Sequence, residues 1–151
     1  MSELRRVLLA EDNLKDAELT LAALEENRLA NEVVVVRDGA EAWDYLTRQG
    51  HYADRPPGSP AVVLLDLKMP KIDGLEVLRR MKADDDLCMI PVVMLTSSRE
   101  QQDLIESYRL GVNAYVVKPV AFDVFVTAVK NLGLFWAVVN EPPPGTIRRA
   151  A

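Results

Sequence analysis

Cysteine, histidine and long apolar runs are scarce in this sequence of 151 residues. The single cysteine, Cys88, excludes an internal disulfide and any metal site built from several cysteines. The single histidine, His51, lies in a segment rich in Pro and Gly and is expected at the surface. No apolar run approaches the roughly 20 residues that span a bilayer, and the short N-terminal run is followed at once by acids, unlike a signal peptide. We therefore expect a cytoplasmic protein that makes no contact with a membrane.

Positive charge is also in deficit, with 18 Lys and Arg against 23 Asp and Glu and a net charge of −5. An acidic chain lacks the basic surface with which proteins hold nucleic acids, so direct nucleic-acid binding is not expected. The length fits one domain, and the 49% of hydrophobic residues suffice for one core. We predict a single domain over residues 1–140 and a Pro-rich tail over residues 141–151, where three successive prolines oppose a helix.

Short apolar runs rich in β-branched residues alternate with segments of helical spacing. Several of these runs are apolar without alternation, which is typical of strands covered on both faces of a parallel sheet. The predicted strands cover residues 6–10, 32–37, 61–66, 91–95 and 114–117, and the predicted helices cover residues 14–24, 40–46, 75–81, 104–108 and 122–138. Capping boxes are expected at three helix starts, at Asp38-x-x-Glu41, Asp73-x-x-Glu76 and Ser98-x-x-Gln101. Five such units in series predict an α/β fold, a doubly wound parallel sheet with helices on both faces.

Chemically active side chains follow the predicted strands, at the edge where open parallel sheets bind ligands. These residues are Glu11 and Asp12 after the first strand, Asp66 after the third, Thr96 after the fourth and Lys118 after the fifth. Crowded carboxylates repel one another at neutral pH, and a hard divalent cation such as Mg²⁺ relieves that repulsion. With the cation bound, one carboxylate can attack a phosphorus atom, while the cation and Lys118 neutralise charge on the transferred group. The pattern predicts a metal-dependent phosphoacceptor, with Asp66 as the acceptor.

Each of these residues alone also has an ordinary interpretation. Glu11 and Asp12 can form a polar loop and a helix cap, Thr96 can cap a strand end, and Lys118 can be solvated. Asp66 is harder to explain in this way, because it closes the apolar run AVVLL at the edge of the sheet. The combination is therefore more specific than any of its members.

Four motifs resemble the receiver domain of two-component response regulators, the CheY-like fold, over nearly the whole chain. They are Glu11-Asp12, LLDLKMPKIDG at Leu64–Gly74, LTSS at Leu95–Ser98 and AYVVKP at Ala114–Pro119. The resemblance implies a flavodoxin-like (βα)5 fold with strand order 2-1-3-4-5 and an extended C-terminal helix. It also implies that Asp66 takes a phosphoryl group from a phosphohistidine of a sensor histidine kinase, and that the protein is no enzyme beyond slow self-dephosphorylation.

The same resemblance implies roles for the remaining site residues. Mg²⁺ would be bound by Glu11, Asp12, Asp66 and the backbone carbonyl of Lys68. Thr96 and Lys118 would contact the phosphoryl group, Thr96 and Tyr115 would form the conformational switch, and the Lys118–Pro119 bond would be cis. Two positions depart from the usual pattern. Glu11 stands where many receivers have Asp, and Lys68 borders the path of the hydrolytic water, which leaves the lifetime of the phosphorylated form open.

The predicted last helix is more apolar than one buried face requires, and exposed apolar patches usually mark contacts. The ending LFWAVVNEPPP resembles single-domain regulators that pair with phytochrome-type histidine kinases. Such regulators tend to form homodimers through this region, and the expected dimer or partner contacts are Phe135, Trp136 and Val139.

Three other functions remain to be weighed. A phosphatase of the haloacid dehalogenase type needs a second Asp two residues after the nucleophile, where this chain has Lys68. A flavodoxin-like cofactor carrier needs a phosphate-binding loop after the first strand, where this chain is acidic. The stronger rival is a phosphorylation-independent dimeric adaptor with a receiver fold. Such inactive receivers usually lose the phosphoacceptor or the lysine, and this chain keeps both Asp66 and Lys118.

Overall fold

The computed structural model describes residues 6–26, 32–96 and 101–117. In these ranges strands and helices alternate as β1 Arg6–Ala10, α1 Leu14–Glu26, β2 Glu32–Val36, α2 Gly39–Thr47, η1 Gly50–Tyr52, β3 Val62–Asp66, α3 Gly74–Lys82, β4 Val92–Thr96, α4 Gln101–Arg109 and β5 Ala114–Val117. The five predicted strands are confirmed, with ends that differ by at most one residue, and so are the first four helices. The predicted helix over 122–138 and the tail over 141–151 lie outside the described residues.

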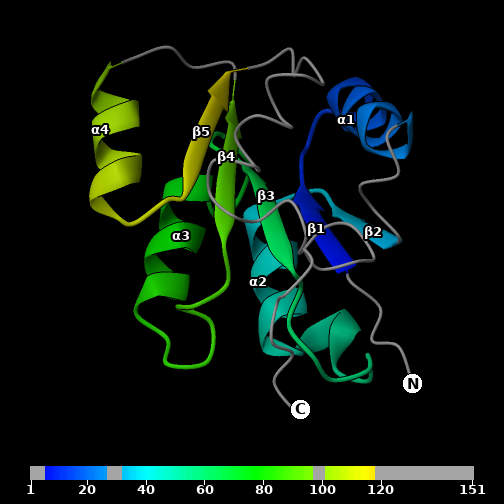
Figure 1. The fold of residues 1–151 in the computed structure, drawn as a ribbon. Coiled ribbons are helices and arrows are strands. Elements are labelled where there is room, and N and C mark those ends of the chain that lie inside the picture. The colour runs from blue at the N-terminus through cyan, green and yellow to red at the C-terminus, as the bar shows by residue number, and fades with distance from the viewer. Residues whose placement is uncertain (1–5, 27–31, 97–100, 118–151) are drawn as a thin grey trace, which may run out of the picture.

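The five strands form one parallel sheet in the order β2-β1-β3-β4-β5 (Figure 1). After β2 the chain reverses its direction across the sheet, because β3 pairs with the other side of β1. With right-handed crossovers, this reversal places α1 on one face and the later helices on the other. The reversal also makes the carboxyl ends of β1 and β3 the point where such sheets bind ligands. No helix in the described ranges is long and apolar enough to span a membrane.

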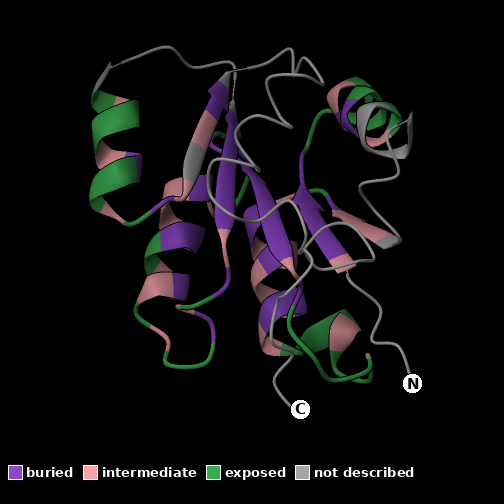
Figure 2. Cartoon of the chain, in the orientation of Figure 1, coloured by how far each residue is buried: buried purple, intermediate pink, exposed green. Residues whose placement is uncertain are grey.

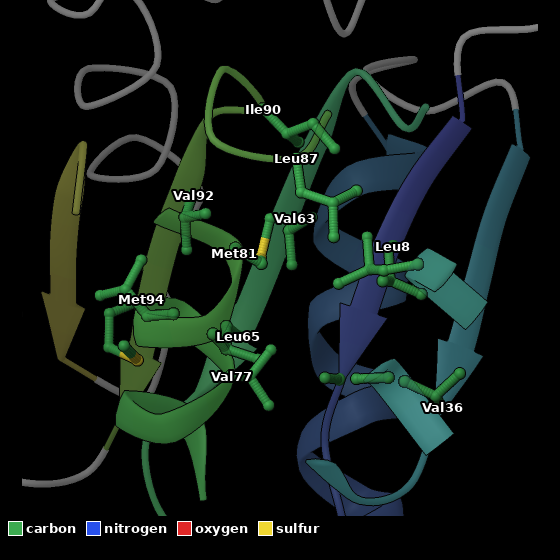
Figure 3. Close-up of a cluster of buried hydrophobic side chains, with 14 of the residues drawn as sticks. Leu8, Val36, Val63, Leu65, Val77, Met81, Leu87, Ile90, Val92 and Met94 are labelled. Atoms are coloured by element: carbon green, nitrogen blue, oxygen red, sulfur yellow. The ribbon is translucent and has the colours of Figure 1, made fainter. Parts of the chain in front are cut away.

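The central strands are buried on both faces, which explains why their sequences are apolar without alternation. All five residues of β3 are buried (Figure 2). Successive side chains of a strand point to opposite faces, so such a strand needs a cover on each side. On one face, β1–β4 pack against α2, α3 and the loop after α3, in a cluster that includes Leu8, Val36, Val63, Leu65, Val77, Met81, Leu87, Ile90, Val92 and Met94 (Figure 3). This core fixes the position of the strand ends that carry the site.

Carboxylate caps begin two of the helices as predicted. Asp38 accepts a hydrogen bond from the backbone N–H of Glu41, and Asp73 accepts one from the N–H of Glu76. The reciprocal bond of a capping box is absent in both cases, and that part of the prediction is wrong. Glu41 accepts instead from the N–H of Arg37 and from the Tyr52 hydroxyl.

The Glu76 carboxylate pairs within α3 and does not reach back to the backbone N–H of Asp73. It pairs with Arg79 and Arg80, one turn further on α3. The hydrogen bonds from Arg79 and Arg80 hold the pKa of the Glu76 carboxyl below its usual value. A guanidinium one turn away therefore competes with the cap backbone for this carboxylate. The third predicted box, Ser98-x-x-Gln101, begins outside the described residues.

The segment after α2 is fastened to that helix although it is rich in Pro and Gly. Arg55 donates hydrogen bonds to the carbonyl oxygens of Tyr45, Pro56 and Gly58, and its guanidinium lies 4.3 Å from the centre of the Tyr45 ring. The Tyr52 hydroxyl lies 2.6 Å from a carboxylate oxygen of Glu41. Burial and this carboxylate raise the pKa of Tyr52 above its ordinary value. The single histidine in this segment is exposed, as predicted.

Candidate functional site

Three carboxylates meet at the carboxyl ends of β1 and β3. The register of the two strands pairs Ala10 with Leu65, so Glu11, which follows β1, and Asp66, which ends β3, lie side by side. One carboxylate oxygen from each of Glu11, Asp12 and Asp66 lies within 4.8 Å of the others. We call these three residues the acidic pocket.

The three members of the acidic pocket differ in exposure. Glu11 and Asp66 are buried, with 3% and 6% of their surfaces exposed, whereas Asp12 is exposed. The backbone N–H of Glu11 donates to the carbonyl oxygen of Val36, and its carboxylate accepts from the N–H of Asn13. Glu11 is thus held at both its backbone and its side chain, and its longer side chain brings its carboxylate into the pocket. Solvent reaches the pocket on the side of Asp12.

The donor set of the acidic pocket fits a hard divalent cation. All three donors are carboxylate oxygens, the ligands that Mg²⁺ and Ca²⁺ prefer. Oxygens bound to one such ion at about 2.0–2.6 Å can lie up to about 4–5 Å apart, which matches the 4.8 Å spacing. Three negative charges at this spacing repel one another, and two of them are removed from bulk water. A cation with two positive charges would offset that cost.

The loop after β3 is tightly folded around the end of Asp66. The N–H of Gly74 donates to the carbonyl oxygen of Leu67 at 2.7 Å. A Cβ atom on Gly74 would lie 2.3 Å from the backbone oxygen of Asp66, so only glycine fits at this helix start. Leu67 and Met69 are buried, whereas Lys68 between them is exposed. Within the described ranges, the Lys68 side chain has no hydrogen bond or ion pair.

The structure describes the other predicted site residues only in part. Thr96 ends β4 and its backbone is in register with Val117 of β5, but its side chain lies outside the described part of the chain. Lys118 and Pro119 follow β5 directly and also lie outside it. Tyr115 is half-buried in β5, where it packs against the core cluster. The predicted dimer contacts Phe135, Trp136 and Val139 lie outside the described residues as well.

Sequence reasoning missed a contact between the loop after β3 and residues 36–41. We call these residues the β2–α2 turn; they run from the last residue of β2 through the first three residues of α2. Gly39 in this turn lies against the backbone of Ile72, and Asp38 forms an ion pair with Lys71. The Asp-Gly pair after a predicted strand was a signal that the chain turns sharply here. Nothing in the sequence told which other segment the turn would meet.

The fold and the acidic pocket together define a doubly wound α/β domain with a carboxylate site where the strand order reverses. A family model described as the response regulator receiver domain matches residues 7–130. The response regulator Rcp1 of Synechocystis sp. is 39% identical over 130 residues, which are 86% of this chain and 87% of Rcp1. A solved Mn²⁺-bound form of Rcp1 has a TM-score of 0.74 at 36% identity, over 97% of this chain and 99% of that one.

Two further solved structures are similar to this chain. The bacteriophytochrome response regulator AtBRR is 66% identical with a TM-score of 0.82, and the match covers 92% of this chain and 99% of AtBRR. The phosphorylated cyanobacterial phytochrome response regulator RcpA is 41% identical with a TM-score of 0.75, over 89% of this chain and 94% of RcpA. The chain therefore belongs to the response regulator receiver domain family, whose members are phosphoacceptors in two-component signalling.

Proposed function

We propose that this protein is a single-domain response regulator that accepts a phosphoryl group on Asp66 in a Mg²⁺-dependent reaction. The observation behind the choice of Asp66 is its place in the acidic pocket. It is buried at the end of a fully buried strand, and its carboxylate lies within 4.8 Å of the carboxylates of Glu11 and Asp12. An aspartate held in one position beside two metal-ligating carboxylates is what an aspartyl-phosphate acceptor requires.

Mg²⁺ would be held by Glu11, Asp12, Asp66 and the backbone carbonyl of Lys68. The oxygen donor set and its spacing support this assignment, and so does the Mn²⁺ in the solved form of Rcp1. When bound, the cation supplies positive charge against the oxygens of the transferred group. The chain's own contribution is to orient the Asp66 carboxylate and to keep the two neighbouring carboxylates on the side where the cation binds.

The transfer itself is a displacement at phosphorus. A carboxylate oxygen of Asp66 forms a bond to the phosphorus of a phosphohistidine, the P–N bond breaks, and the histidine leaves with the bonding electron pair. The hydroxyl of Thr96 and the ammonium of Lys118 would contact the phosphoryl oxygens and offset their charge. Water would later hydrolyse the acyl phosphate, and Lys68, which is exposed two residues after Asp66, would border the path of that water.

The donor would be a sensor histidine kinase of the phytochrome type. This part of the proposal is supported by the names of AtBRR and RcpA, both phytochrome response regulators. Phosphorylation would shift a two-state equilibrium through Thr96 and Tyr115, and the signal would pass through protein contacts of a homodimer. Phe135, Trp136 and Val139 are the proposed contacts. We place the protein in the cytoplasm, without direct contact to nucleic acid or membrane.

Intact mass spectrometry after incubation with acetyl phosphate tests this function. The wild type should gain one phosphoryl group in Mg²⁺ and none in EDTA, and Asp66→Asn should gain none in either. Light scattering on the same samples reports whether the oligomer changes. If neither acetyl phosphate nor a phytochrome-type kinase phosphorylates a folded wild-type dimer, the phosphorylation-independent adaptor replaces the proposal.

A further inference from the structure

The turn between β2 and α2 packs directly against the loop that follows Asp66. A Cβ atom on Gly39 would lie 1.7 Å from the backbone oxygen of Ile72 and 2.5 Å from its carbonyl carbon. Real Cβ atoms essentially never approach a heavy atom of a residue that is not their chain neighbour closer than 3.0 Å. Gly39 is therefore required for the close approach of two backbones, and any side chain would push the loop away.

An ion pair reinforces this contact. The Lys71 ammonium lies 3.4 Å from one carboxylate oxygen of Asp38, while the other oxygen caps α2 through the N–H of Glu41. Lys71 has a φ of 68°, an uncommon value for a residue with a side chain, and the next N–H, of Ile72, donates to the carbonyl oxygen of Pro70. The loop residues that contact the turn, Lys71 and Ile72, thus lie where the backbone of this loop bends sharply.

The same turn is joined to the segment that carries Glu11. The carbonyl oxygen of Val36, at the start of the turn, accepts the backbone N–H of Glu11 at 2.9 Å. Glu41, at the end of the turn, accepts from the N–H of Arg37 and fixes the turn from within. The turn therefore contacts both chain segments that supply the acidic pocket, although none of the pocket carboxylates belongs to it.

We propose that the β2–α2 turn is a positioning element for the metal and phosphoryl site, and that Gly39 and the Asp38–Lys71 pair act through the loop after β3. The turn sets the distance between the end of β1 and this loop, and with it the spacing of the pocket carboxylates and the Lys68 carbonyl. This inference rests on the function proposed above. It adds residues that touch neither the metal nor the phosphoryl group.

Gly39→Ala tests the inference with Mn²⁺ as the probe. To restore 3.0 Å, the new methyl group must displace the loop by roughly 1 Å, and misplacement on this scale can lower a reaction rate about 100-fold. Loss of a contact that orients metal ligands typically weakens metal binding about 10- to 100-fold. We therefore expect the Mn²⁺ dissociation constant of the full-length protein, measured from the electron paramagnetic resonance of free Mn²⁺, to rise at least about ten-fold.

Gly58→Ala is the matched control. Gly58 has a φ of 124°, so this substitution strains the backbone, but no atom lies within 4 Å of the added Cβ. The control therefore reports what general backbone strain does to metal binding far from the pocket. Equal Mn²⁺ affinity in folded Gly39→Ala and Gly58→Ala proteins would overturn the inference.

Lys71→Met separates positioning from simple electrostatics, and it decides the question if Gly39→Ala does not fold. Removing a positive charge near an acidic pocket should by itself strengthen cation binding. Loss of the ion pair should weaken it instead, by up to about five-fold for a pair of this exposure. Weaker Mn²⁺ binding supports the inference, because the change of charge alone would give tighter binding, and tighter binding contradicts it. A wild type that binds no Mn²⁺ would contradict the proposed function itself, which is a different result.

Discussion

Asp12→Asn should stabilise the metal-free protein, because it relieves repulsion inside the acidic pocket. Two unit charges 4.8 Å apart repel by about 0.9 kcal/mol in water and about 3.5 kcal/mol at an effective dielectric constant of 20. Asp12 is exposed, so the value for water applies to its interactions with Glu11 and Asp66. In the described residues Asp12 has no hydrogen bond or ion pair that the substitution would break. We expect the free energy of unfolding to rise by about 1–2 kcal/mol.

Urea unfolding measures the stability of both proteins, first without the cation in EDTA and then in excess Mg²⁺. In EDTA, Asp12→Asn should be the more stable protein. In Mg²⁺ the wild type should gain about 2.7 kcal/mol at 100 times the dissociation constant, and the variant should gain less because a neutral amide replaces one charged ligand. Asp54→Asn, the same substitution at an exposed acid outside the pocket, should change stability by less than about 0.5 kcal/mol. If Asp12→Asn were no more stable than Asp54→Asn in EDTA, the carboxylates would not repel as reasoned.

Three further predictions concern the fold that supports the pocket. Folding raises the pKa of Tyr52 above its ordinary 10.0, so the unfolded chain loses this proton first and stability falls as the pH rises above 10. In urea unfolding at pH 9 and pH 11, Tyr52→Phe should therefore lose less unfolding free energy between the two pH values than the wild type does. An equal loss in both proteins would contradict this role of Tyr52. Leu78→Ala, at a fully buried position of α3, should cost about 2–5 kcal/mol by urea unfolding, and a cost below about 1 kcal/mol would contradict the packing described. Asp73→Ala should lower the free energy of unfolding by about 0.5–2 kcal/mol, because it removes the side chain that caps α3. Asp73→Asn keeps a capping oxygen and should be nearly neutral, so equal losses in the two variants would show that the cap bond is unimportant.

The strands and the doubly wound sheet could be predicted because the signal for them is local. A run such as Val62–Leu65 is apolar without alternation only if both faces are covered, and the structure buries every residue of it. The acidic pocket could be predicted for a related reason. Parallel strands bring their carboxyl ends to one edge, so Glu11 and Asp66 meet although they are far apart in sequence.

The partners of individual side chains could not be predicted with the same rules. Glu41 has the spacing of a capping box, but it accepts from Arg37 and from the hydroxyl of Tyr52, which reaches it from the segment after α2. Gly39 would be read as a turn residue from sequence, whereas its close approach to Ile72 depends on where a distant loop lies. Such contacts are set by tertiary packing, which a local pattern does not contain.

The most direct test of the central claim identifies which of the three pocket carboxylates takes the phosphoryl group. The phosphorylated protein is treated with borohydride, which reduces an acyl phosphate to an alcohol, and its peptides are sequenced by mass spectrometry. Asp66, Glu11 and Asp12 compete within 4.8 Å, so the outcome is not settled by proximity alone. The account predicts reduction at Asp66 and at neither neighbour. Reduction at Glu11 or Asp12, or retention of the adduct in Asp66→Asn, would contradict it.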